Sequence, residues 1–189
     1  FKWSKYRDFL IKHIKAHPEF IVPEARKNEM LEFAKNIKDI PISRTNFKWG
    51  IPALNDPEQV IYVWFDGLTN YITGVGFPDD ALKFEKFWPA DVHILGKDNV
   101  RWHALLWPAM LKSAGLELPK TILVNGFLSL NGQKISKSIG NIIRPSDWVS
   151  KFGADAVRYY LIQAGPLTED SDISEEKLKI VYNADLANG

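Results

Sequence analysis

The stretch DVHILGKD (residues 91–98) decides the fold class of this chain. Its first five residues predict a buried strand, and Gly96 then leads into a helix that we expect over residues 99–113. Gly115 is a natural C-cap for this helix, and the run TILV at residues 121–124 predicts the next strand. A strand, a helix and a strand in this order form a βαβ unit, so we expect an α/β fold with a mostly parallel sheet.

A second apolar run, VIYVWF (residues 60–65), is continuous and rich in β-branched and aromatic side chains. Such a run predicts a strand that is buried on both faces. Asp66 follows it directly, and α/β sheets place their ligands at the ends of strands. We therefore expect Asp66 to lie near a binding site.

The loop NGQKISKSIGN (residues 131–141) follows the strand predicted over residues 121–124. Its Asn-Gly pair favours a tight hairpin turn. Lys134, Ser136, Lys137 and Ser138 offer ammonium charges and hydroxyl donors, and the loop has no acidic residue to neutralise them. A polyphosphate requires such groups. The alternative is a solvated basic turn, as most short charge runs are.

Composition limits the classes of protein to which the chain can belong. Its 189 residues are 46% hydrophobic, which is enough for one domain with a core or for part of a larger one. The chain has no cysteine, so we expect neither a disulfide framework nor a cysteine-ligated metal. The net charge of +1 provides no general attraction to nucleic acid. Without a long apolar run or a signal sequence, we expect a soluble, cytoplasmic protein with no membrane partner.

Two further stretches contain clustered ionisable residues. His13 and His17 are spaced as i, i+4, but no third ligand is near them and Pro18 ends the helix there, so we expect no metal site. The acidic run at residues 168–172 predicts a polar linker.

The lysine loop also resembles a known signature. KISKS (residues 134–138) resembles the KMSKS motif of class I aminoacyl-tRNA synthetases, with Ile135 in place of Met. Several separated motifs, in the same order, are similar to methionyl members of that family over essentially the whole chain. They are ISR (42–44), WGIP (49–52), VWFD (63–66) with Tyr71, GKD (96–98) with WH (102–103), and FGADAVRYY (152–160).

The resemblance implies a Rossmann-like fold and a division of the chain. Residues 1–40 would be the helical end of a connective insertion, and residues 41–144 the second half of the catalytic fold with the lysine loop. Residues 145–189 would begin a helical stem-contact region. The family's His-Ile-Gly-His-type signature, zinc-bearing knob and anticodon-binding bundle are not in this sequence. We therefore expect a fragment that is inactive alone and has no zinc site.

The resemblance implies ATP-dependent activation of methionine to methionyl-adenylate, followed by transfer to tRNA(Met). The partners would be methionine, ATP with Mg²⁺, and tRNA(Met). This reaction brings a carboxylate to a polyphosphate, so positioned cations can supply the rate without a side-chain nucleophile. By resemblance, Lys137 is the chief catalytic residue, Lys134 assists it, and Ser136 and Ser138 shape the ATP-binding loop.

The remaining ATP-binding candidates lie where the strand at 91–95 meets the following helix. Gly96 and Asp98 stand there, and Asp98 can accept hydrogen bonds from ribose hydroxyls. Its alternative role is that of a helix N-cap. The resemblance also places the adenine edge against the backbone near Phe127 and Leu128.

The methionine-binding candidates implied by the resemblance are Trp64, Gly67, Tyr71, His103 and Trp107. A thioether is polarizable and a weak acceptor, so aromatic walls with a hydroxyl or imidazole donor suit it. His103 and Trp107 share one helical face, being four residues apart. The alternative is ordinary core packing, which explains most buried aromatic side chains.

Arg44 and Asp66 are expected to support the site. Arg44 has the fork shape that suits a carboxylate, although a surface ion pair would explain it as well. Two other functions remain open on the sequence. One is another class I synthetase that shares the lysine loop, such as the leucyl, isoleucyl, valyl or cysteinyl enzyme. The other is a non-catalytic synthetase-like module that binds RNA or protein.

Overall fold

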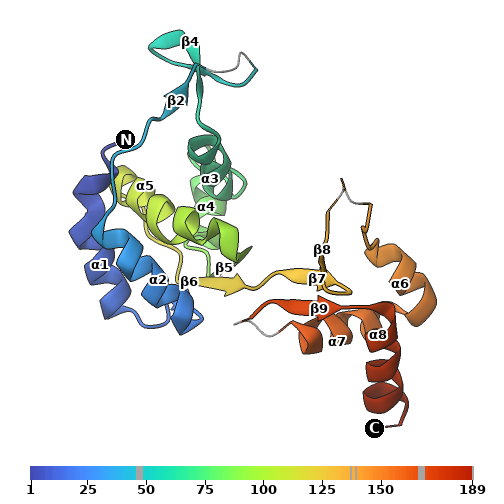
Figure 1. Cartoon of the computed structure of the whole chain (residues 1–189). Helices are drawn as coiled ribbons and strands as arrows, with labels where there is room; N and C mark the ends of the chain where they lie inside the picture. The colour runs from blue at the N-terminus through green and yellow to red at the C-terminus, as the bar shows by residue number, and fades with distance from the viewer. Residues whose placement is uncertain (46–48, 137, 139, 166–168, 189) are drawn as a thin grey trace. The chain divides into compact units, whose positions relative to one another are not determined.

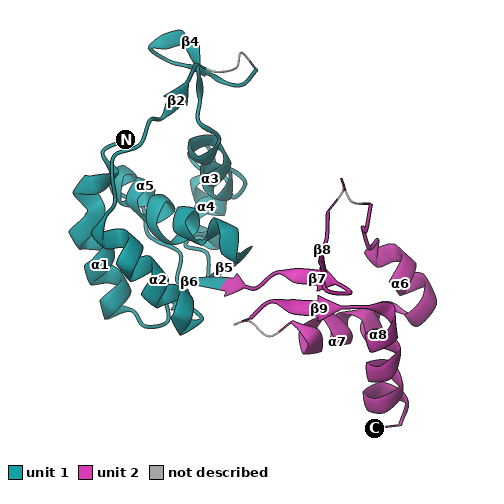
Figure 2. Cartoon of the chain, in the orientation of Figure 1, with its two compact units in different colours: residues 1–123 teal, residues 124–189 magenta. Residues whose placement is uncertain are grey.

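The structure is a computed structural model that describes residues 1–45, 49–136, 138, 140–165 and 169–188 (Figure 1). The chain forms two compact units, Phe1–Leu123 and Val124–Gly189 (Figure 2). They are called unit 1 and unit 2.

Unit 1 begins with helices that pack on one another. The 3-10 helix η1 (Trp3–Tyr6) leads into α1 (Arg7–Ala16), and α2 (Glu24–Lys35) follows the short strand β1 (Ile21–Val22). Buried side chains recur one helical turn apart, as Leu10 and Ile14 on α1 and as Met30 and Ala34 on α2. This spacing forms one apolar stripe on each helix, which explains why the two helices bury these faces.

A small sheet lies mostly within unit 1, and its strand β6 crosses the boundary after Leu123. It contains β1, β6 (Thr121–Asn125) and β5 (Val92–Gly96) in the order β1-β6-β5, and β1 pairs with β6 in parallel. The strands predicted at residues 91–95 and 121–124 are thus present. Alternate side chains of β5, His93 and Leu95, are buried, as expected for a strand with one covered face.

The helix predicted between these strands is present but not uniform. It comprises a 3-10 turn η2 (Lys97–Asn99), a π-helical segment η3 (Trp102–Leu106) and α5 (Trp107–Ala114). Pro108 lies in the first turn of α5, directly after the wider π turn, where the missing proline N–H is tolerated. Gly115 ends α5 with φ +72°, the left-handed geometry expected of a C-cap glycine.

The strand predicted over residues 60–65 is wrong beyond Ile61. Strand β4 (Asp56–Ile61) pairs antiparallel with β2 (Ser43–Arg44) and β3 (Pro52–Ala53), and helix α3 (Val63–Thr73) starts immediately afterwards. Leu68 and Ile72 of α3 are buried one turn apart, so helical packing overrides the strand preference of the apolar run. Asp66 therefore lies in the first turn of a helix and not at a strand end. Helix α4 (Ala81–Phe87) follows.

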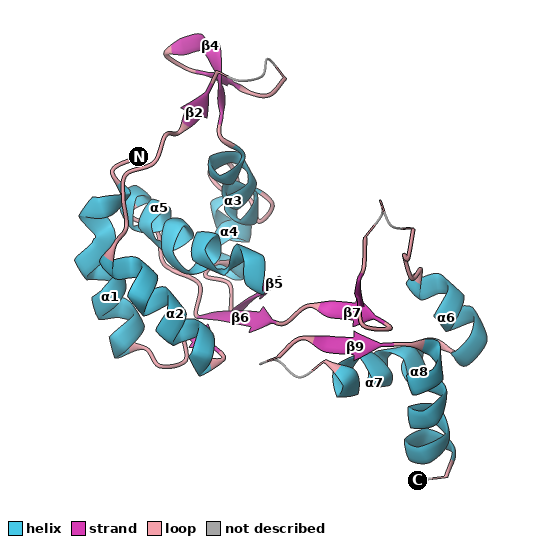
Figure 3. Cartoon of the chain, in the orientation of Figure 1, coloured by secondary structure: helices cyan, strands magenta, loops and turns pink. Residues whose placement is uncertain are grey.

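Unit 2 packs three helices against the third sheet of the chain. Strands β7 (Leu128–Leu130), β8 (Gln133–Lys134) and β9 (Ser171–Ile173) lie in the order β8-β7-β9, with β7 antiparallel to β8 and parallel to β9 (Figure 3). The helices are α6 (Pro145–Phe152), α7 (Ala154–Ala164) and α8 (Glu175–Val181), and the π-helical η4 (Tyr182–Ala187) extends α8. The core consists of Trp148, Val157, Tyr160, Ile173 and Leu178.

Strand β9 corrects another prediction. Residues 171–172 belong to a strand and not to a polar linker, because β7 supplies partners for their backbone groups. The α/β fold class is confirmed by the parallel strand pairs and flanking helices. The domain boundaries at residues 40 and 144 stay predictions. Within the described part of the chain, no helix is long and apolar enough to cross a membrane.

Candidate functional site

Unit 1 gathers four of the five predicted methionine-binding residues around an aromatic and histidine cluster. Helix α3 supplies Trp64 and Tyr71, and the η3–α5 helix supplies His103 and Trp107. The ring centroid of Tyr71 lies 5.6 Å from that of His103 and 6.3 Å from that of Trp107. Trp64 meets the His103 ring edge-on at 6.1 Å. The predicted residues thus come together although they are far apart in the sequence.

A hydrogen-bond chain fixes the protonation of His103. Its Nδ1 atom lies 2.9 Å from the carbonyl oxygen of Asn99, which can only accept, so Nδ1 carries the proton. Burial lowers the pKa of His103, and the bond to Asn99 only partly opposes this, so the ring is neutral at pH 7. Nε2 is then an acceptor, and the Tyr71 hydroxyl donates to it across 2.9 Å. Burial also raises the pKa of Tyr71, which keeps the phenol protonated.

His93 on β5 belongs to the same cluster and was not predicted as a site residue. Its ring centroid lies 4.3 Å from that of Tyr71. Burial, and then the neighbouring His103, lower the pKa of His93 to about 4. The only sequence signal was its position two residues before Leu95 on the buried face of the strand.

Two polar atoms in this cluster are buried without a hydrogen-bond partner among the described residues. They are Nε2 of His93 and the indole Nε1 of Trp107, whose side chain is 1% exposed. Unpaired buried polar atoms are rare in proteins and commonly mark a position where a ligand or water binds. The cluster therefore offers more than the core packing that could also explain its aromatic residues.

An aromatic stack extends the cluster from α3 across η3 to η1. Trp64 stacks on Trp102 with ring centroids 4.9 Å apart, and Trp102 stacks in turn on Trp3 at 6.2 Å. Gly67, the fifth predicted methionine-binding residue, is exposed on α3, and a Cβ atom there would meet nothing within 4 Å. The structure thus places Gly67 on the same helix as Trp64 and Tyr71 but leaves open space beside it.

The supporting residues Arg44 and Asp66 line one cavity of about 530 Å³. The other lining residues are Trp49, Gly50, Ile51, Ile61, Tyr62 and Val63. The Arg44 guanidinium lies over the Tyr62 ring, 3.7 Å from its centroid, in a cation–π contact. The structure therefore brings together a cation and a carboxylate in a partly apolar pocket, although sequence had placed Asp66 at a strand end.

Gly96 and Asp98 lie where β5 passes into the following helix. Gly96 is the N-cap of η2, and Asp98 is an exposed residue within that 3-10 turn. The N-cap role considered for Asp98 thus belongs to Gly96. The Asp98 carboxylate stands at the carboxyl end of a strand of the parallel sheet, the edge at which α/β folds bind ligands.

The remaining ATP-binding candidates belong to unit 2. Asn131 and Gly132 have φ of +50° and +76°, the left-handed geometry of the predicted hairpin turn between β7 and β8. Lys134 is exposed on β8, and the hydroxyl oxygens of Ser136 and Ser138 lie 2.8 Å apart. Lys137 lies outside the described residues.

Leu128, the predicted adenine contact, starts β7 and is 39% exposed. It lines a cavity of about 540 Å³ in unit 2. The other lining residues are Asn125, Gly126, Phe127, Leu161, Ile162, Gly165, Glu169 and Ser171. Leu128 and Lys134 therefore occupy the two strands of one hairpin, each with an accessible surface.

Asn141 is a loop residue whose role was not predicted. Its side-chain oxygen accepts a hydrogen bond from the Ser136 N–H, and its side-chain nitrogen donates to the Lys134 carbonyl oxygen, each at 2.9 Å. Asn141 therefore connects the two ends of the segment from Lys134 to Asn141 through its side chain. Its sequence signal was its place at the end of the Gly-Asn pair.

The His13 and His17 rings approach to 4.5 Å between centroids. Over the part of the chain that the structure describes, no group of three or more His, Cys, Asp or Glu side chains is arranged to hold a metal ion.

Comparison with known proteins covers the whole chain. The family model described as tRNA synthetases class I (M) matches residues 1–189. Proteins named methionine--tRNA ligase from Thermotoga maritima and Mycobacterium leprae are 51% and 49% identical over the whole chain. The chain covers 30% and 35% of these two relatives. It thus spans about a third of the length of the curated relatives it matches.

Solved structures agree with this assignment. Mycobacterium tuberculosis methionyl-tRNA synthetase bound by methionyl-adenylate is 47% identical, with a TM-score of 0.92 over the whole chain and 37% of that structure. The free form of that enzyme is 45% identical, with a TM-score of 0.87 over the whole chain and 36% of that structure. The family match covers every residue, so this chain belongs to the class I tRNA synthetases (M).

Proposed function

We propose that this chain supplies part of the catalytic domain of a methionyl-tRNA synthetase. The protein containing it would activate methionine with ATP to methionyl-adenylate and transfer the methionyl group to tRNA(Met). The observation that carries the proposal is the family match over residues 1–189, with relatives near 50% identity named methionine--tRNA ligase.

The proposed methionine pocket is the cluster of Trp64, Tyr71, His103 and Trp107, with Gly67 beside it. The methionine side chain is uncharged and polarizable, so it requires aromatic walls and neutral polar partners. His103 is held neutral by burial and accepts a hydrogen bond from the Tyr71 hydroxyl, which fixes the phenol in one orientation. An imidazolium at this place would attract anions and water instead of a thioether.

The proposed ATP-binding residues are Gly96 and Asp98 in unit 1 and Leu128, Lys134, Ser136, Lys137 and Ser138 in unit 2. Asp98 accepts hydrogen bonds from ribose hydroxyls beside Gly96, and Leu128 lies against the adenine. Lys134, Ser136, Lys137 and Ser138 hold the phosphates, together with Mg²⁺ that accompanies ATP. The exposure of Lys134 and Ser138 supports this role, since an anion can reach their polar groups.

In the proposed reaction, a carboxylate oxygen of methionine forms a bond to the α-phosphorus of ATP. The bond from that phosphorus to the bridging oxygen breaks, and pyrophosphate leaves with the electron pair. Lys137 and Lys134 stabilise the negative charge that develops on the leaving group. Arg44, with its planar fork, and Asp66 support binding of the charged ends of the amino acid.

Two alternatives considered from the sequence are disfavoured by specific observations. A leucyl, isoleucyl, valyl or cysteinyl synthetase does not fit relatives that are named methionine--tRNA ligase. A non-catalytic module is disfavoured by the same relatives, which are named as ligases and are about 50% identical over the whole chain. We therefore propose the methionine-specific enzyme.

The test is amino-acid-dependent pyrophosphate exchange by the longest natural form of the protein. Exchange should require methionine and ATP, and leucine, isoleucine, valine and cysteine should each fail to support it. Exchange with one of these four in place of methionine would contradict the substrate, and no exchange with any amino acid would contradict the activity. The same assay on the 189-residue chain alone tests the expectation that this segment is inactive by itself.

A further inference from the structure

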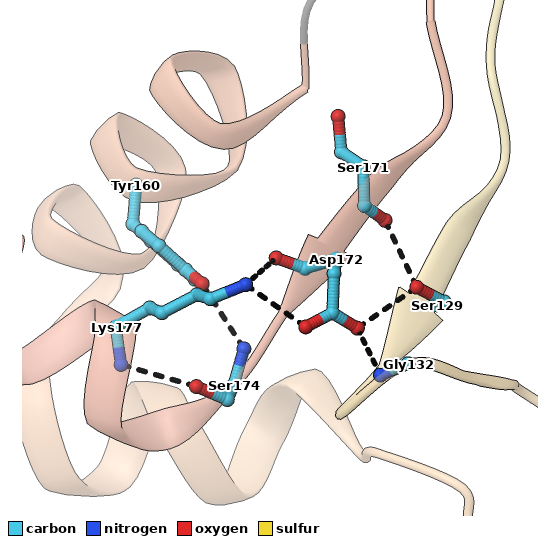
Figure 4. A network of polar contacts seen from close by, with 7 residues as sticks. All are labelled: Ser129, Gly132, Tyr160, Ser171, Asp172, Ser174 and Lys177. Carbon is cyan, nitrogen blue, oxygen red and sulfur yellow. Dashed lines mark hydrogen bonds and ion pairs between the residues drawn. The ribbon is translucent and has the colours of Figure 1, made fainter.

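Asp172 on β9 joins three parts of unit 2 through its carboxylate. Oδ1 accepts hydrogen bonds from the Ser129 hydroxyl on β7 at 2.8 Å and from the Gly132 N–H in the hairpin turn at 2.5 Å. Oδ2 accepts from Nζ of Lys177 on α8 at 2.8 Å (Figure 4). One side chain therefore connects the hairpin that carries Lys134 to a helix forty residues further along the chain.

The carboxylate is ionised under all physiological conditions. Lys177, then the Gly132 N–H, then the Ser129 hydroxyl lower the pKa of Asp172 to about 2. Hydrogen bonds to an ionised acceptor are about twice as strong as those between neutral groups. Both carboxylate oxygens thus remain acceptors at neutral pH, Oδ1 for the hairpin and Oδ2 for Lys177.

The contacts of Asp172 fix the turn from outside the hairpin. Asn131 and Gly132 adopt left-handed geometry, and the Asn131 N–H donates to the Ile173 carbonyl oxygen at 3.3 Å. Ser129, which donates to Asp172, is paired directly with Lys134 across the hairpin. The position of Lys134 therefore depends on the hydrogen bonds that hold the hairpin against Asp172 and Ile173 of β9.

The start of α8, which carries Lys177, is held in turn by a residue of the core of unit 2. The Ser174 hydroxyl caps α8 by accepting from the Lys177 N–H, and the Tyr160 hydroxyl accepts from the Ser174 N–H. Tyr160 is 1% exposed. Asp172 thus links the exposed hairpin to the start of α8, which is itself bonded to the buried Tyr160.

We propose that Asp172 is a positioning residue for the lysine loop in adenylate formation. It fixes the position of Lys134 on β8, and it does not contact the substrates itself. This inference rests on the proposed function of the loop. A displacement of about 1 Å in a reacting group can cost about a hundredfold in rate, so loss of the fastening should slow catalysis strongly.

Three variants separate positioning from stability. Asp172→Ala removes all the side-chain bonds, whereas Asp172→Asn keeps an oxygen acceptor for Ser129 and Gly132 and replaces the oxygen that accepts from Lys177 with an amide NH2 group. The matched control is Glu175→Ala. Glu175 is also a carboxylate whose pKa is lowered by lysines. Its ion pairs are with Lys151 on α6 and Lys179 on α8, and both of these helices lie outside the hairpin.

The first measurement is single-turnover formation of methionyl-adenylate by the longest natural form of the protein. Asp172→Ala should lower the rate at saturating substrates by about tenfold to a hundredfold, with the methionine dissociation constant within about twofold of wild type. Asp172→Asn should restore most of the rate, and Glu175→Ala should keep it within about twofold. Equal losses in Asp172→Ala and Glu175→Ala, in proportion to their melting temperatures, would overturn the proposal.

The second measurement does not depend on activity. Hydrogen–deuterium exchange over residues 128–136 should accelerate in Asp172→Ala and remain near wild type in Asp172→Asn and Glu175→Ala, while α7 stays protected in all three. Unchanged exchange in Asp172→Ala would overturn the proposal. If the wild-type protein forms no methionyl-adenylate but Asp172→Ala loosens the hairpin, the proposed function fails and the fastening by Asp172 stands.

Discussion

The aromatic and histidine cluster of unit 1 depends on burial, whereas the lysine loop of unit 2 is exposed and is held by hydrogen bonds. In the cluster, His93, His103 and Trp107 are buried, and desolvation keeps both histidines neutral. In the loop, Lys134 is exposed, and hydrogen bonds from Asn141 and the Asp172 network hold the backbone. The cluster residues thus form part of the core of unit 1 as well as the proposed methionine pocket. The loop exposes its positive charge to solvent and contributes little to the core of unit 2. Mutations should therefore damage folding in one region and catalysis in the other.

The largest contrast should be in stability. Trp107→Ala should lower the free energy of unfolding by about 3–5 kcal/mol, because it removes a fully buried aromatic side chain and leaves a cavity. Lys134→Ala should change it by less than about 0.5 kcal/mol, since the side chain is solvated. Urea unfolding of the chain, followed by tryptophan fluorescence and circular dichroism, measures both. A similar loss in the two variants would remove the distinction between the regions.

The loop should show the reverse pattern in catalysis. Lys137→Ala should slow methionyl-adenylate formation by roughly two to three orders of magnitude, the scale for one transition-state donor, with the melting temperature unchanged. Lys134→Ala should cost less, because water or Mg²⁺ can partly replace a flanking cation. Single-turnover assays at saturating ATP and methionine provide the comparison. A wild-type rate in Lys137→Ala would reduce the loop to a basic turn.

Acid should weaken unit 1 before unit 2. The pKa of His93 is about 4 in the folded state and about 6.5 when unfolded, so its stabilising contribution is present above pH 6.5 and lost as the pH falls toward 4. At about 1.36 kcal/mol per pKa unit, the loss is about 3 kcal/mol, and the lowered pKa of His103 acts in the same direction. Asp172 contributes its stability above about pH 3.8 and loses it as the pH falls through about 2.

Replacing His93 tests this order. The variant His93→Gln should flatten the decline in unfolding free energy between pH 6.5 and 4, as measured by urea titrations across that range. Asp172→Asn should leave the same interval unchanged. A pH profile of His93→Gln that overlays the wild type would show that His93 is not the group that titrates.

The smallest expected effect concerns one hydroxyl group. Tyr71→Phe leaves the buried Nε2 of His103 without its donor, so the free energy of unfolding should fall by about 1–2 kcal/mol. Tyr159→Phe is the matched control in unit 2, because Tyr159 is as exposed as Tyr71 but donates to an exposed acceptor, Asp185, at 3.2 Å. Its cost should stay below about 0.5 kcal/mol. An equal cost for both hydroxyls would mean that burial of the acceptor His103 does not strengthen the Tyr71–His103 bond.

Local patterns in the sequence predicted part of this molecule correctly. The strands at 92–96 and 121–125, the left-handed Gly115 and the Asn131-Gly132 turn follow from residues that are neighbours along the chain. Periodicity and turn chemistry act over a few residues, so they can be recognised without a structure. The resemblance of separated motifs then identified the candidate site residues, four of which the structure brings together at one cluster.

The run at 60–65 shows where local information is insufficient. A short apolar run fits a buried strand or a buried helix equally well, and the packing of Leu68 and Ile72 places its second half in α3. Tertiary structure alone also decided that His93 joins the cluster and that Asp172 fastens the hairpin. The partners of Asp172 at Ser129 and Gly132 lie about forty residues away in the sequence. Sequence spacing cannot identify such partners, because chain folding, and not local preference, brings the donor to its acceptor.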